Sequence, residues 1–347
     1  MNSWRGENMK SFDKIEPKFH ISEDNKKNIK KIEERLSLIK FTDPIKERNL
    51  QIKSRVRSIH SSLAIEANSL SLESVENIVD NKLVLGDRKE IQEVKNANEL
   101  YEHMDEYDWR SENDFLKAHT LLMKCFNDDH GYYRNHGEAV KKGNKIIYTA
   151  PQSVLVPTLM KSLFQYINDN KNDVHPLVLS SLFHYYFVCI HPFSDGNGRI
   201  ARFWVGLILN DWNPVFKYIP IEEEIYLNQE EYYNSIAQSH INGNANVFID
   251  FMLKSISSSL KKTTQKTTQK IKLNNNQLRI LELVQKNPRI TRNELANHLG
   301  ITPDGVKYHL KKMVDNEIVE RIGPDNGGYW SIKEKDILNE RISNEKI

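Results

Sequence analysis

The sequence lacks three features that would each indicate a particular class of protein. It contains no run of about 18 or more apolar residues, so it predicts no membrane-spanning helix and no membrane partner. Cysteine occurs only at Cys125 and Cys189, without CxxC spacing, which predicts neither a disulfide framework nor a cysteine zinc site. No apolar stretch follows the charged N-terminal residues, so we expect no secretory signal. Together these absences predict a protein of the reducing cytoplasm.

What the sequence does contain is typical of a folded protein with more than one domain. Its 347 residues are 39% hydrophobic and 28% charged, which predicts two or three packed domains. Residues 261–347 carry 17 Lys and Arg against 11 Asp and Glu, a net charge of +6, whereas the preceding residues carry 32 against 36, a net charge of −4. A basic C-terminal segment of this kind is typical of a module that faces nucleic acid.

Apolar residues recur at helical spacing through most of the chain, which predicts a mainly α fold. The pattern predicts a separate amphipathic helix over Ser54–Ala67. It also predicts a central helix over Pro176–Ile190, because that stretch is almost wholly apolar. The short run Lys145–Tyr148 follows Gly143-Asn144 and predicts a small β-hairpin.

The C-terminal third divides into a linker and a small domain. The Lys-Thr-Gln repeat that starts at Lys261 is polar and lacks core-forming residues, which predicts a linker. Beyond it, the pattern predicts three helices and a two-stranded wing, as in a winged helix-turn-helix. We therefore expect an N-terminal helical region (1–105), a core (106–260), a linker (261–275) and a winged helix-turn-helix domain (276–347).

Residues 191–202, with the sequence HPFSDGNGRIAR, contain features typical of a phosphate site. The glycines at 196 and 198 let backbone N–H groups approach a ligand closely, and the helix that follows adds the positive end of its dipole. Arg199 and Arg202 lie three residues apart, on one helix face, where forked hydrogen bonds could hold successive phosphates.

Two further side chains of the same segment suggest a reaction. Asp195 offers a hard carboxylate oxygen of the kind that Mg²⁺ prefers. The imidazole of His191, largely neutral at cytoplasmic pH, is a natural general base. The alternative is a glycine-rich helix start with a solvated histidine and two surface arginines. That alternative accounts for each residue singly, but not for the ordered set within twelve residues.

This segment resembles the signature of the Fic family, HPFx(D/E)GNGRxxR, without a mismatch, and a looser similarity extends over about residues 55–255. The resemblance implies an all-helical core and transfer of a nucleoside monophosphate, most often AMP from ATP, to a protein hydroxyl. By position it implies that His191 deprotonates the target Ser, Thr or Tyr and that Asp195 holds Mg²⁺. The residues implied for the phosphates are Asn197 with Gly196 and Gly198 for the α-phosphate, Arg199 for the β-phosphate and Arg202 for the γ-phosphate.

The predicted hairpin resembles the family's flap, which pins the target peptide by strand addition. The residues concerned are Lys145, Ile146, Ile147 and Tyr148. Thr149-Ala150-Pro151 stands where many relatives carry His-x-Pro. Tyr232 and Tyr233 match an aromatic pair that packs near the adenine in relatives, and their spacing suits a helix core equally well.

A second motif, Ser62 to Asn68, resembles the family's inhibitory motif (S/T)xxxE(G/N) in its N-terminal arrangement. Ser62 and Glu66 are i and i+4, hence on one face of a helix of about residues 54–68. The resemblance implies that Glu66 pairs with Arg202 and takes the place that the γ-phosphate needs. Ala67 replaces the usual glycine. Taken alone, the pattern also fits any amphipathic helix with a solvated glutamate.

The basic C-terminal domain resembles a winged helix-turn-helix, with its recognition helix over Pro303–Asn316. The residues that could contact DNA are Lys307, Tyr308, Lys311 and Lys312. A dimerisation or substrate-docking module would use the same fold, so DNA contact stays an alternative at this point.

The sequence thus predicts a mainly α protein with a Fic helical core, a small β-hairpin flap and a C-terminal winged helix-turn-helix domain. We expect an autoinhibited adenylyltransferase that uses ATP and Mg²⁺ to modify a target protein or itself. The rival is a DNA-binding regulator in which the core senses nucleotide. Transfer of UMP, phosphate or phosphocholine also stays open, as do the target protein and the formation of a homo-oligomer.

Overall fold

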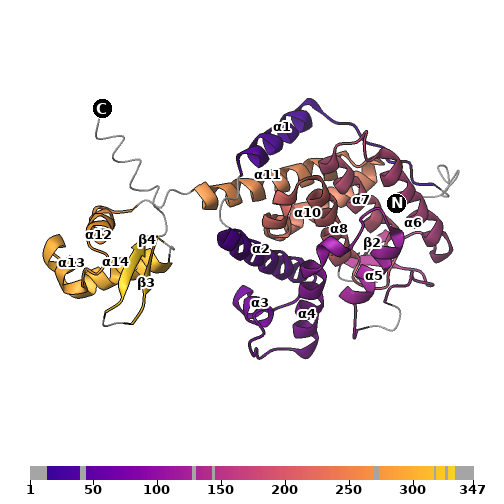
Figure 1. Cartoon of the computed structure of the whole chain (residues 1–347). Coiled ribbons are helices and arrows are strands. Elements are labelled where there is room, and N and C mark those ends of the chain that lie inside the picture. Colours follow the sequence, from indigo (N-terminus) through magenta and orange to yellow (C-terminus); the bar gives the residue numbers. More distant parts are fainter. Residues whose placement is uncertain are drawn as a thin grey trace. The chain divides into compact units, whose positions relative to one another are not determined.

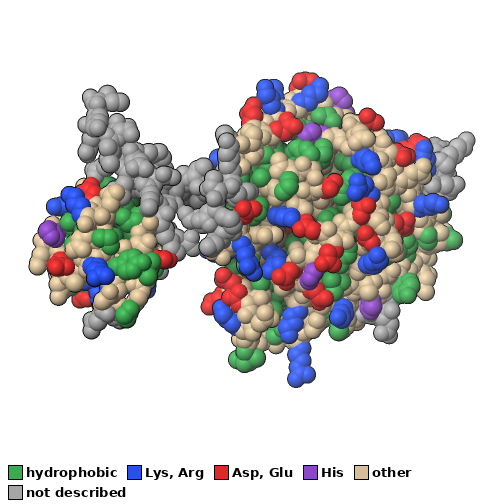
Figure 2. Space-filling model, in the orientation of Figure 1, with side chains coloured by type: hydrophobic (Ala, Val, Ile, Leu, Met, Phe, Trp, Pro, Cys, Tyr) green, Lys and Arg blue, Asp and Glu red, His purple; other side chains and the backbone are tan. Residues whose placement is uncertain are grey.

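The computed structural model describes residues 14–39, 44–126, 130–142, 145–268, 273–315, 318–324 and 327–332 (Figure 1). The chain divides into two compact units, one ending at Thr264 and the other beginning at Gln265. In the part of the chain that is described, none of the helices is long and apolar enough to cross a membrane. Lys and Arg side chains are interspersed with Asp and Glu over the face of the first unit shown in Figure 2.

The first unit is almost entirely helical, as predicted from the spacing of its apolar residues. Its elements, in chain order, are α1 (Glu23–Leu38), α2 (Pro44–Ile65), α3 (Leu72–Val79), α4 (Arg88–Glu102), η1 (Met104–Glu106), α5 (Glu112–Leu122), β1 (Ala139–Lys142), β2 (Lys145–Thr149), η2 (Ser153–Leu155), α6 (Val156–Asn170), α7 (Pro176–Ile190), α8 (Asn197–Trp212), η3 (Pro214–Tyr218), α9 (Ile221–Leu227), α10 (Gln229–Asn242) and α11 (Asn246–Thr268).

Helices α7 and α8 pack against each other at the centre of this unit. Both are buried along most of their length, as the apolar sequence of α7 predicted. Helix α7 starts where the Nδ1 atom of His175 accepts a hydrogen bond from the Leu177 N–H, with Pro176 at its first position. The short connection between α7 and α8 carries the candidate site, so a rigid, buried helix pair supports it on both sides.

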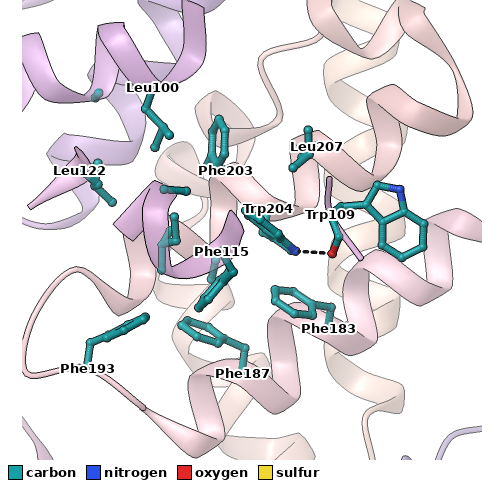
Figure 3. Close-up of a cluster of buried hydrophobic side chains, with 14 of the residues drawn as sticks. Leu100, Trp109, Phe115, Leu122, Phe183, Phe187, Phe193, Phe203, Trp204 and Leu207 are labelled. Atoms are coloured by element: carbon teal, nitrogen blue, oxygen red, sulfur yellow. Dashed lines mark hydrogen bonds between the residues drawn. The ribbon is translucent and has the colours of Figure 1, made fainter. Parts of the chain in front are cut away.

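Aromatic side chains fill the core around α7 and α8 (Figure 3). Phe115 of α5 lies at the centre of this cluster, fully buried, with its ring 4.9 Å from that of Trp204. The indole N–H of Trp204 donates to the backbone carbonyl of Trp109 over 3.0 Å, so the one polar atom of this side chain is satisfied. The ring of Phe193, from the α7–α8 connection, stacks on Phe115 at 5.7 Å and anchors the connection in the core.

This packing predicts a large effect of truncating Phe115. Phe115→Ala is expected to lower the free energy of unfolding by about 3–5 kcal/mol, because the ring cannot be replaced by neighbours that are already close-packed. Tyr132→Ala is the matched control: Tyr132 is 72% exposed, and surface substitutions usually change stability by less than about 0.5 kcal/mol. Denaturant unfolding of both variants measures the difference, and equal midpoints would contradict the central position of Phe115.

Helix α2 differs from the sequence prediction. The structure has one helix over Pro44–Ile65, so the separate helix predicted to start at Ser54 is wrong. No proline or glycine interrupts residues 45–65, and the helix continues until Ala67 adopts a positive φ of 69°. Along its buried face, Ser58 donates a hydrogen bond of 2.6 Å to Glu222 of α9, which Tyr101 of α4 also contacts at 2.9 Å.

Strands β1 and β2 form the predicted hairpin. They pair antiparallel, from Ala139 opposite Thr149 to Lys142 opposite Lys145, with an irregularity between Val140 and Lys141. The predicted turn residues Gly143-Asn144 lie outside the described residues. The hairpin immediately precedes η2 and α6, so its base is tied to the helical core.

The second unit has the winged helix-turn-helix architecture predicted from the sequence. Its elements are α12 (Asn275–Lys286), α13 (Arg292–Leu299), α14 (Pro303–Asp315), β3 (Val319–Ile322) and β4 (Tyr329–Ile332). Asn274 with Gln277, and Thr291 with Glu294, form capping boxes that start α12 and α13. Gly300, with a φ of +66°, ends α13 and makes the tight turn.

Helix α11 continues through residues 261–268, where the sequence predicted the start of a linker. Thr263 is buried there, and the Lys262 ammonium pairs with the buried Glu224 carboxylate of α9. Lys262 and Thr263 are therefore still packed as part of the first unit. The rest of the predicted linker is described only from residue 273 onwards, and residues 333–347 lie outside the described residues.

Candidate functional site

The connection between α7 and α8 is a tight backbone turn that places the start of α8 next to His191. His191 itself ends α7 with a φ of 51°, and Gly196 precedes α8 with a φ of 81°. A Cβ atom on Gly196 would lie 2.7 Å from the Met123 Sδ atom, so only glycine fits this turn. The first N–H groups of α8 have no partner within their own helix and carry its positive dipole end, so this helix start is suited to bind an anion.

The side chain of Asn197 braces this turn. Its Oδ1 atom accepts a hydrogen bond from the Phe193 N–H over 3.0 Å, and its Nδ2 donates to the Phe193 carbonyl over 2.8 Å. The amide therefore holds the backbone of the loop in place, and the α-phosphate role that the resemblance implied for Asn197 stays a prediction. The backbone N–H groups around Gly196 and Gly198 are the donors that the turn presents to an anion.

His119 of α5 is a support of the turn that sequence reasoning missed. Its Nδ1 atom accepts a hydrogen bond from the Gly131 N–H over 3.0 Å, which places the proton on Nε2, and Nε2 lies 3.0 Å from the Asp195 carbonyl. The imidazole also stacks on the Phe193 ring, with centroids 3.5 Å apart. A single buried histidine on an amphipathic helix gives no sequence signal of this role.

The environment of His191 keeps its imidazole neutral. Burial lowers the pKa of His191 below its ordinary value, and the nearby charge of Arg134 acts in the same direction, whereas Glu138 and Glu66 raise it. A neutral imidazole can accept a proton from a hydroxyl group at neutral pH. His191 thus has the protonation state that a general base requires.

Asp195 has the properties of a metal-binding carboxylate. Burial would raise its pKa, but the charge of Arg199 and a hydrogen bond from the Gly196 N–H hold the pKa below the usual range. Arg199 and the Gly196 N–H both contact the Oδ1 atom, at 2.7 and 2.6 Å, and the side chain is half-exposed. This leaves Oδ2 able to bind an ion. One carboxylate oxygen beside a phosphate site fits Mg²⁺, which usually takes few protein ligands.

Ser62, near the end of α2, and Glu66, just after it, both contact Arg202 of α8; the resemblance implied the contact of Glu66. The Arg202 Nη2 atom lies 2.8 Å from Glu66 Oε1 and donates to the Ser62 carbonyl over 2.9 Å, while Nε donates to the Ser62 hydroxyl over 3.0 Å. The arginine side chain is 1% exposed and the glutamate side chain 35%. Burial would lower the pKa of Arg202, but the carboxylate of Glu66 raises it, so the guanidinium stays charged.

The Glu66 carboxylate stands directly over the first turn of α8. A Cβ atom on Gly198 would lie 2.2 Å from Glu66 Oε1 and 2.9 Å from Arg202 Nη1. Glycine at this position therefore allows an anionic group to approach the helix start, and Glu66 is the group present there. The Nη1 atom is buried, and the described residues offer it no hydrogen-bond partner, so it remains a donor for another anion.

Arg199 is held by a carboxylate that the sequence did not indicate. Its Nη1 atom donates to Glu93 Oε1 of α4 over 3.1 Å, and the arginine side chain is 5% exposed. Asn68, the last residue of the Ser62–Asn68 motif, donates to the other oxygen of Glu93 over 2.8 Å. Arg199 and Arg202 are thus each paired with a carboxylate from the N-terminal helices. Glu93 is one of many charged residues on α4, and only the packing of α4 identifies it.

Tyr232 and Tyr233, the predicted aromatic pair, lie in different environments. Tyr232 is buried in the core, and its hydroxyl lies 2.8 Å from Nε2 of His184. Burial and the charge of Arg202 lower the pKa of His184 to about 3, so that histidine is neutral. Tyr233 is 48% exposed, with its ring 5.1 Å from that of Tyr232. Tyr233 remains able to contact a base, whereas Tyr232 has the core position that was the alternative.

In the hairpin, Tyr148 is the predicted residue whose side chain the structure describes. Its hydroxyl donates to the backbone carbonyl of Cys189, near the end of α7, and this contact ties β2 to the helix that bears His191. The backbone of Lys145, Ile146 and Ile147 forms the rest of β2. Their side chains lie outside the described residues.

In the second unit, the predicted DNA-contacting residues share one exposed face of α14. Lys307, Tyr308, Lys311 and Lys312 are all exposed, while Val306, Leu310 and Met313 of the same helix are buried in the core of the unit. The Lys312 ammonium lies 4.9 Å from the centroid of the Tyr308 ring. This face combines positive charge with an aromatic ring.

Comparison with known proteins places this geometry in a family. The family model described as Fic/DOC family matches residues 109–209. A Fic family protein from Desulfovibrio desulfuricans G20, known from its crystal structure, is 33% identical, with a TM-score of 0.69, over 92% of this chain and 99% of that chain. The chain belongs to the Fic/DOC family. A model described as winged helix-turn-helix DNA-binding matches residues 273–320, so the similarity includes the C-terminal unit.

Other Fic relatives are more distant. The chain is 25% identical over 216 residues to the protein adenylyltransferase fic-1 of Caenorhabditis elegans. It is 31% identical over 153 residues to a probable protein adenylyltransferase of Aquifex aeolicus. It spans 40% and 45% of the length of these two relatives. A Fic domain-containing signaling protein from Bacteroides thetaiotaomicron, 21% identical with a TM-score of 0.58, shares the fold over 69% of this chain and 97% of that chain.

Proposed function

We propose that this Fic protein is an adenylyltransferase that transfers AMP from ATP to a Ser, Thr or Tyr hydroxyl of a target protein or of itself. The observation that carries the proposal is the neutral imidazole of His191 beside the anion-binding start of α8, with Arg199 and Arg202 buried on its first two turns. The named relatives support AMP as the transferred group.

The residues of the site fit the parts of this reaction. His191 takes the proton of the target hydroxyl, the hydroxyl oxygen bonds to the α-phosphorus of ATP, and the bond to the β-phosphate breaks to release pyrophosphate. The backbone N–H groups at the start of α8 hold the α-phosphate, while Arg199 and Arg202 hold the β- and γ-phosphates. Asp195 would hold Mg²⁺, which neutralises phosphate charge when bound. Tyr233 would contact the adenine.

We further propose that Glu66 inhibits this reaction. Its carboxylate lies over Gly198 and pairs with Arg202, so it competes for the arginine that would seat the γ-phosphate. ATP then binds with its α-phosphate out of line with the hydroxyl held by His191. Ser62 supports the inhibited arrangement, because its hydroxyl and carbonyl both accept hydrogen bonds from Arg202.

The experiment that tests the function is a comparison of nucleotides. The full chain and its Glu66→Gly variant are incubated separately with α-labelled ATP, GTP, UTP and CTP, and label on protein is measured. The proposal expects covalent label from ATP in the Glu66→Gly variant. Preferential label from UTP would instead indicate a uridylyltransferase on the same residues. Absence of label from all four nucleotides, in a variant that still binds them, would favour the nucleotide-sensing alternative.

DNA binding through the second unit is the second candidate function, supported by the exposed face of α14 and the matched family model. The double variant Lys307→Glu/Lys311→Glu of the full chain is expected to lose DNA binding, because both side chains would neutralise phosphates. Affinity of the unchanged protein should fall steeply with salt as counterions are released. Lys161→Glu, on the exposed surface of α6, is the control.

Fluorescence anisotropy with random-sequence duplexes at several salt concentrations measures this effect. DNA binding through α14 would be contradicted by an anisotropy increase that persists in the double variant. It would also be contradicted if the unchanged full-length chain bound no duplex at low salt. In that case a docking or dimerisation role for the same unit gains support.

A further inference from the structure

A buried arginine outside the family signature holds together the parts of the site. Arg134 lies in the segment between α5 and β1 and is 3% exposed. Its guanidinium donates hydrogen bonds to four backbone carbonyls: His191 at 2.7 Å from Nε, His136 at 2.6 Å from Nη1, and Pro151 at 2.6 Å and Ile190 at 3.4 Å from Nη2. The backbone N–H of Arg134 also donates to the Pro192 carbonyl over 2.9 Å.

These carbonyls belong to the two structures that must meet during the reaction. His136 precedes the first strand of the hairpin and Pro151 follows its second strand, so the guanidinium contacts both ends of the flap. Ile190 and His191 are the end of α7 and the start of the catalytic turn. The Ala150 N–H also donates to the Glu138 carbonyl over 3.0 Å, which closes the base of the hairpin. Arg134 links this base to the turn carrying His191, in addition to the contact of Tyr148 with Cys189 and a contact of 3.1 Å between His136 Nε2 and Ser194 Oγ.

The guanidinium brings a positive charge as well as hydrogen bonds. Among the described residues, no carboxylate lies within ion-pairing distance of it, and its donors contact backbone carbonyls instead. Burial lowers the pKa of Arg134, and the negative charge of Glu138 raises it. The charged groups that act on His191 are Glu138 and Glu66, which raise its pKa, and Arg134, which lowers it.

We propose that Arg134 is a positioning residue of the transfer reaction, which fixes the flap and the His191 turn as one unit through its four carbonyl contacts. The proposal rests on the proposed adenylyltransferase function, because it assigns Arg134 to the placement of the target hydroxyl against the base. The flap would hold the target backbone, and Arg134 sets where that backbone lies relative to His191. It also favours the neutral imidazole.

Lysine cannot replace arginine in this arrangement. Arginine presents five donors in a planar fork, whereas lysine is a point charge with three donors on one atom. Arg134→Lys therefore keeps the charge beside His191 but loses contacts that diverge toward the flap and the turn. Arg134→Gln loses both the charge and the fork. The two variants separate positioning from electrostatics.

The experiment compares both variants in the full Glu66→Gly chain, with Arg35→Gln as the control. Arg35 of α1 also donates to a backbone carbonyl, that of Ser257 at 3.1 Å, but it takes no part in the site. Three quantities are measured: hydrogen exchange of peptides covering 136–142 and 187–193, the pKa of His191 by NMR titration, and kcat, KM and the ATP dissociation constant. The His191 resonance is assigned by its absence in His191→Ala.

Both Arg134 variants are expected to exchange faster in the two segments, and kcat should fall by on the order of 10²-fold for a displacement of about 1 Å. The ATP dissociation constant should stay unchanged, because Arg134 touches no predicted phosphate site. The pKa of His191 should rise in Arg134→Gln and remain near its parent position in Arg134→Lys. Arg35→Gln should change none of these quantities. If the glutamine variant fails to fold, the lysine variant still tests the positioning role.

Unchanged exchange and kcat in Arg134→Lys would overturn the proposal. Faster exchange with unchanged kcat would overturn it too, since Arg134 would then only stabilise the fold. Failure of the proposed function is recognised separately, as a Glu66→Gly parent that transfers no nucleotide. In that case the exchange and NMR measurements still decide whether Arg134 joins the flap to the His191 turn.

Discussion

Replacing His191 with alanine is expected to abolish nucleotide transfer in the Glu66→Gly chain, while binding of ATP with Mg²⁺ stays largely intact. In the proposed reaction the imidazole contacts the attacking hydroxyl, whereas the start of α8 and its two arginines hold the phosphates. Loss of a general base typically costs on the order of 10²–10⁴ in rate. Self-labelling and calorimetric titration with ATP, performed on the same preparation, measure the two effects.

The pH dependence of transfer provides an independent check of the same role. A general base must be unprotonated, so the rate is expected to fall as the pH drops through the pKa of His191. Because burial and Arg134 lower that pKa, the acid limb should lie below the ordinary imidazole value. A His191→Ala variant that labels itself at the parent rate would contradict the assignment. An acid limb at or above the ordinary imidazole value would contradict the neutral state of His191.

Glu66→Gly is expected to raise the rate of self-modification by at least about 10²-fold. The freed Arg202 would seat the γ-phosphate and so align the α-phosphate with the hydroxyl, and a displacement of the reacting atoms by about 1 Å can cost roughly this factor in rate. The variant leaves the buried Arg202 guanidinium without its carboxylate, so the thermal midpoint of the apo protein should fall. ATP with Mg²⁺ should raise the thermal midpoint part of the way back, since the γ-phosphate of ATP replaces the negative charge of the Glu66 carboxylate beside Arg202. Label incorporation and thermal melting, with and without ATP, measure both effects.

Two further variants show whether the effect of Glu66 acts through Arg202. Arg202→Ala removes the inhibitory partner together with the phosphate contact, so it should stay inactive, and the double variant should resemble it. Glu66→Gln keeps a side chain of the same shape without the charge and should be intermediate. An active Arg202→Ala protein would place the inhibitory contact elsewhere. Equal labelling by the unchanged chain and Glu66→Gly would mean that Ser62–Asn68 is only a structural helix.

Local patterns were enough to predict most of the fold. Apolar spacing predicted α7 at its observed bounds, and apolar spacing with turn residues indicated the three helices and two strands of the second unit. The boundary at Ser54 was wrong, because a change in amphipathic pattern does not end a helix in the absence of a proline or glycine. Helix α9 was not predicted, since its seven residues are too few for a periodic signal.

In the candidate site, too, some contacts could be predicted from the sequence and others could not. Glu66 could be matched with Arg202 because the Ser62–Asn68 motif resembles the family's inhibitory motif, which implies this pair. Glu93 carries no such motif, and its contact with Arg199 depends on where α4 lies against α8. Asn197 is polar and stands within the signature, yet the backbone turn directs its amide to Phe193. These contacts follow from the path of the backbone in space, which residue spacing alone does not specify.

The sequence by itself determined the helical core with its hairpin and the winged helix-turn-helix, because periodicity and turn residues act over about a dozen residues, where the geometry of a helix or a turn fixes which side chains are neighbours. Its signature at residues 191–202 indicated the family, and the resemblance supplied the roles proposed for His191, Asp195, Arg199 and Arg202. Only the tertiary structure decided that Tyr232 is buried while Tyr233 is exposed. It also decided that His119 and Arg134 hold the catalytic turn. Those roles arise because close packing brings together side chains and carbonyls that are distant in sequence, and each buried polar group must find a partner there.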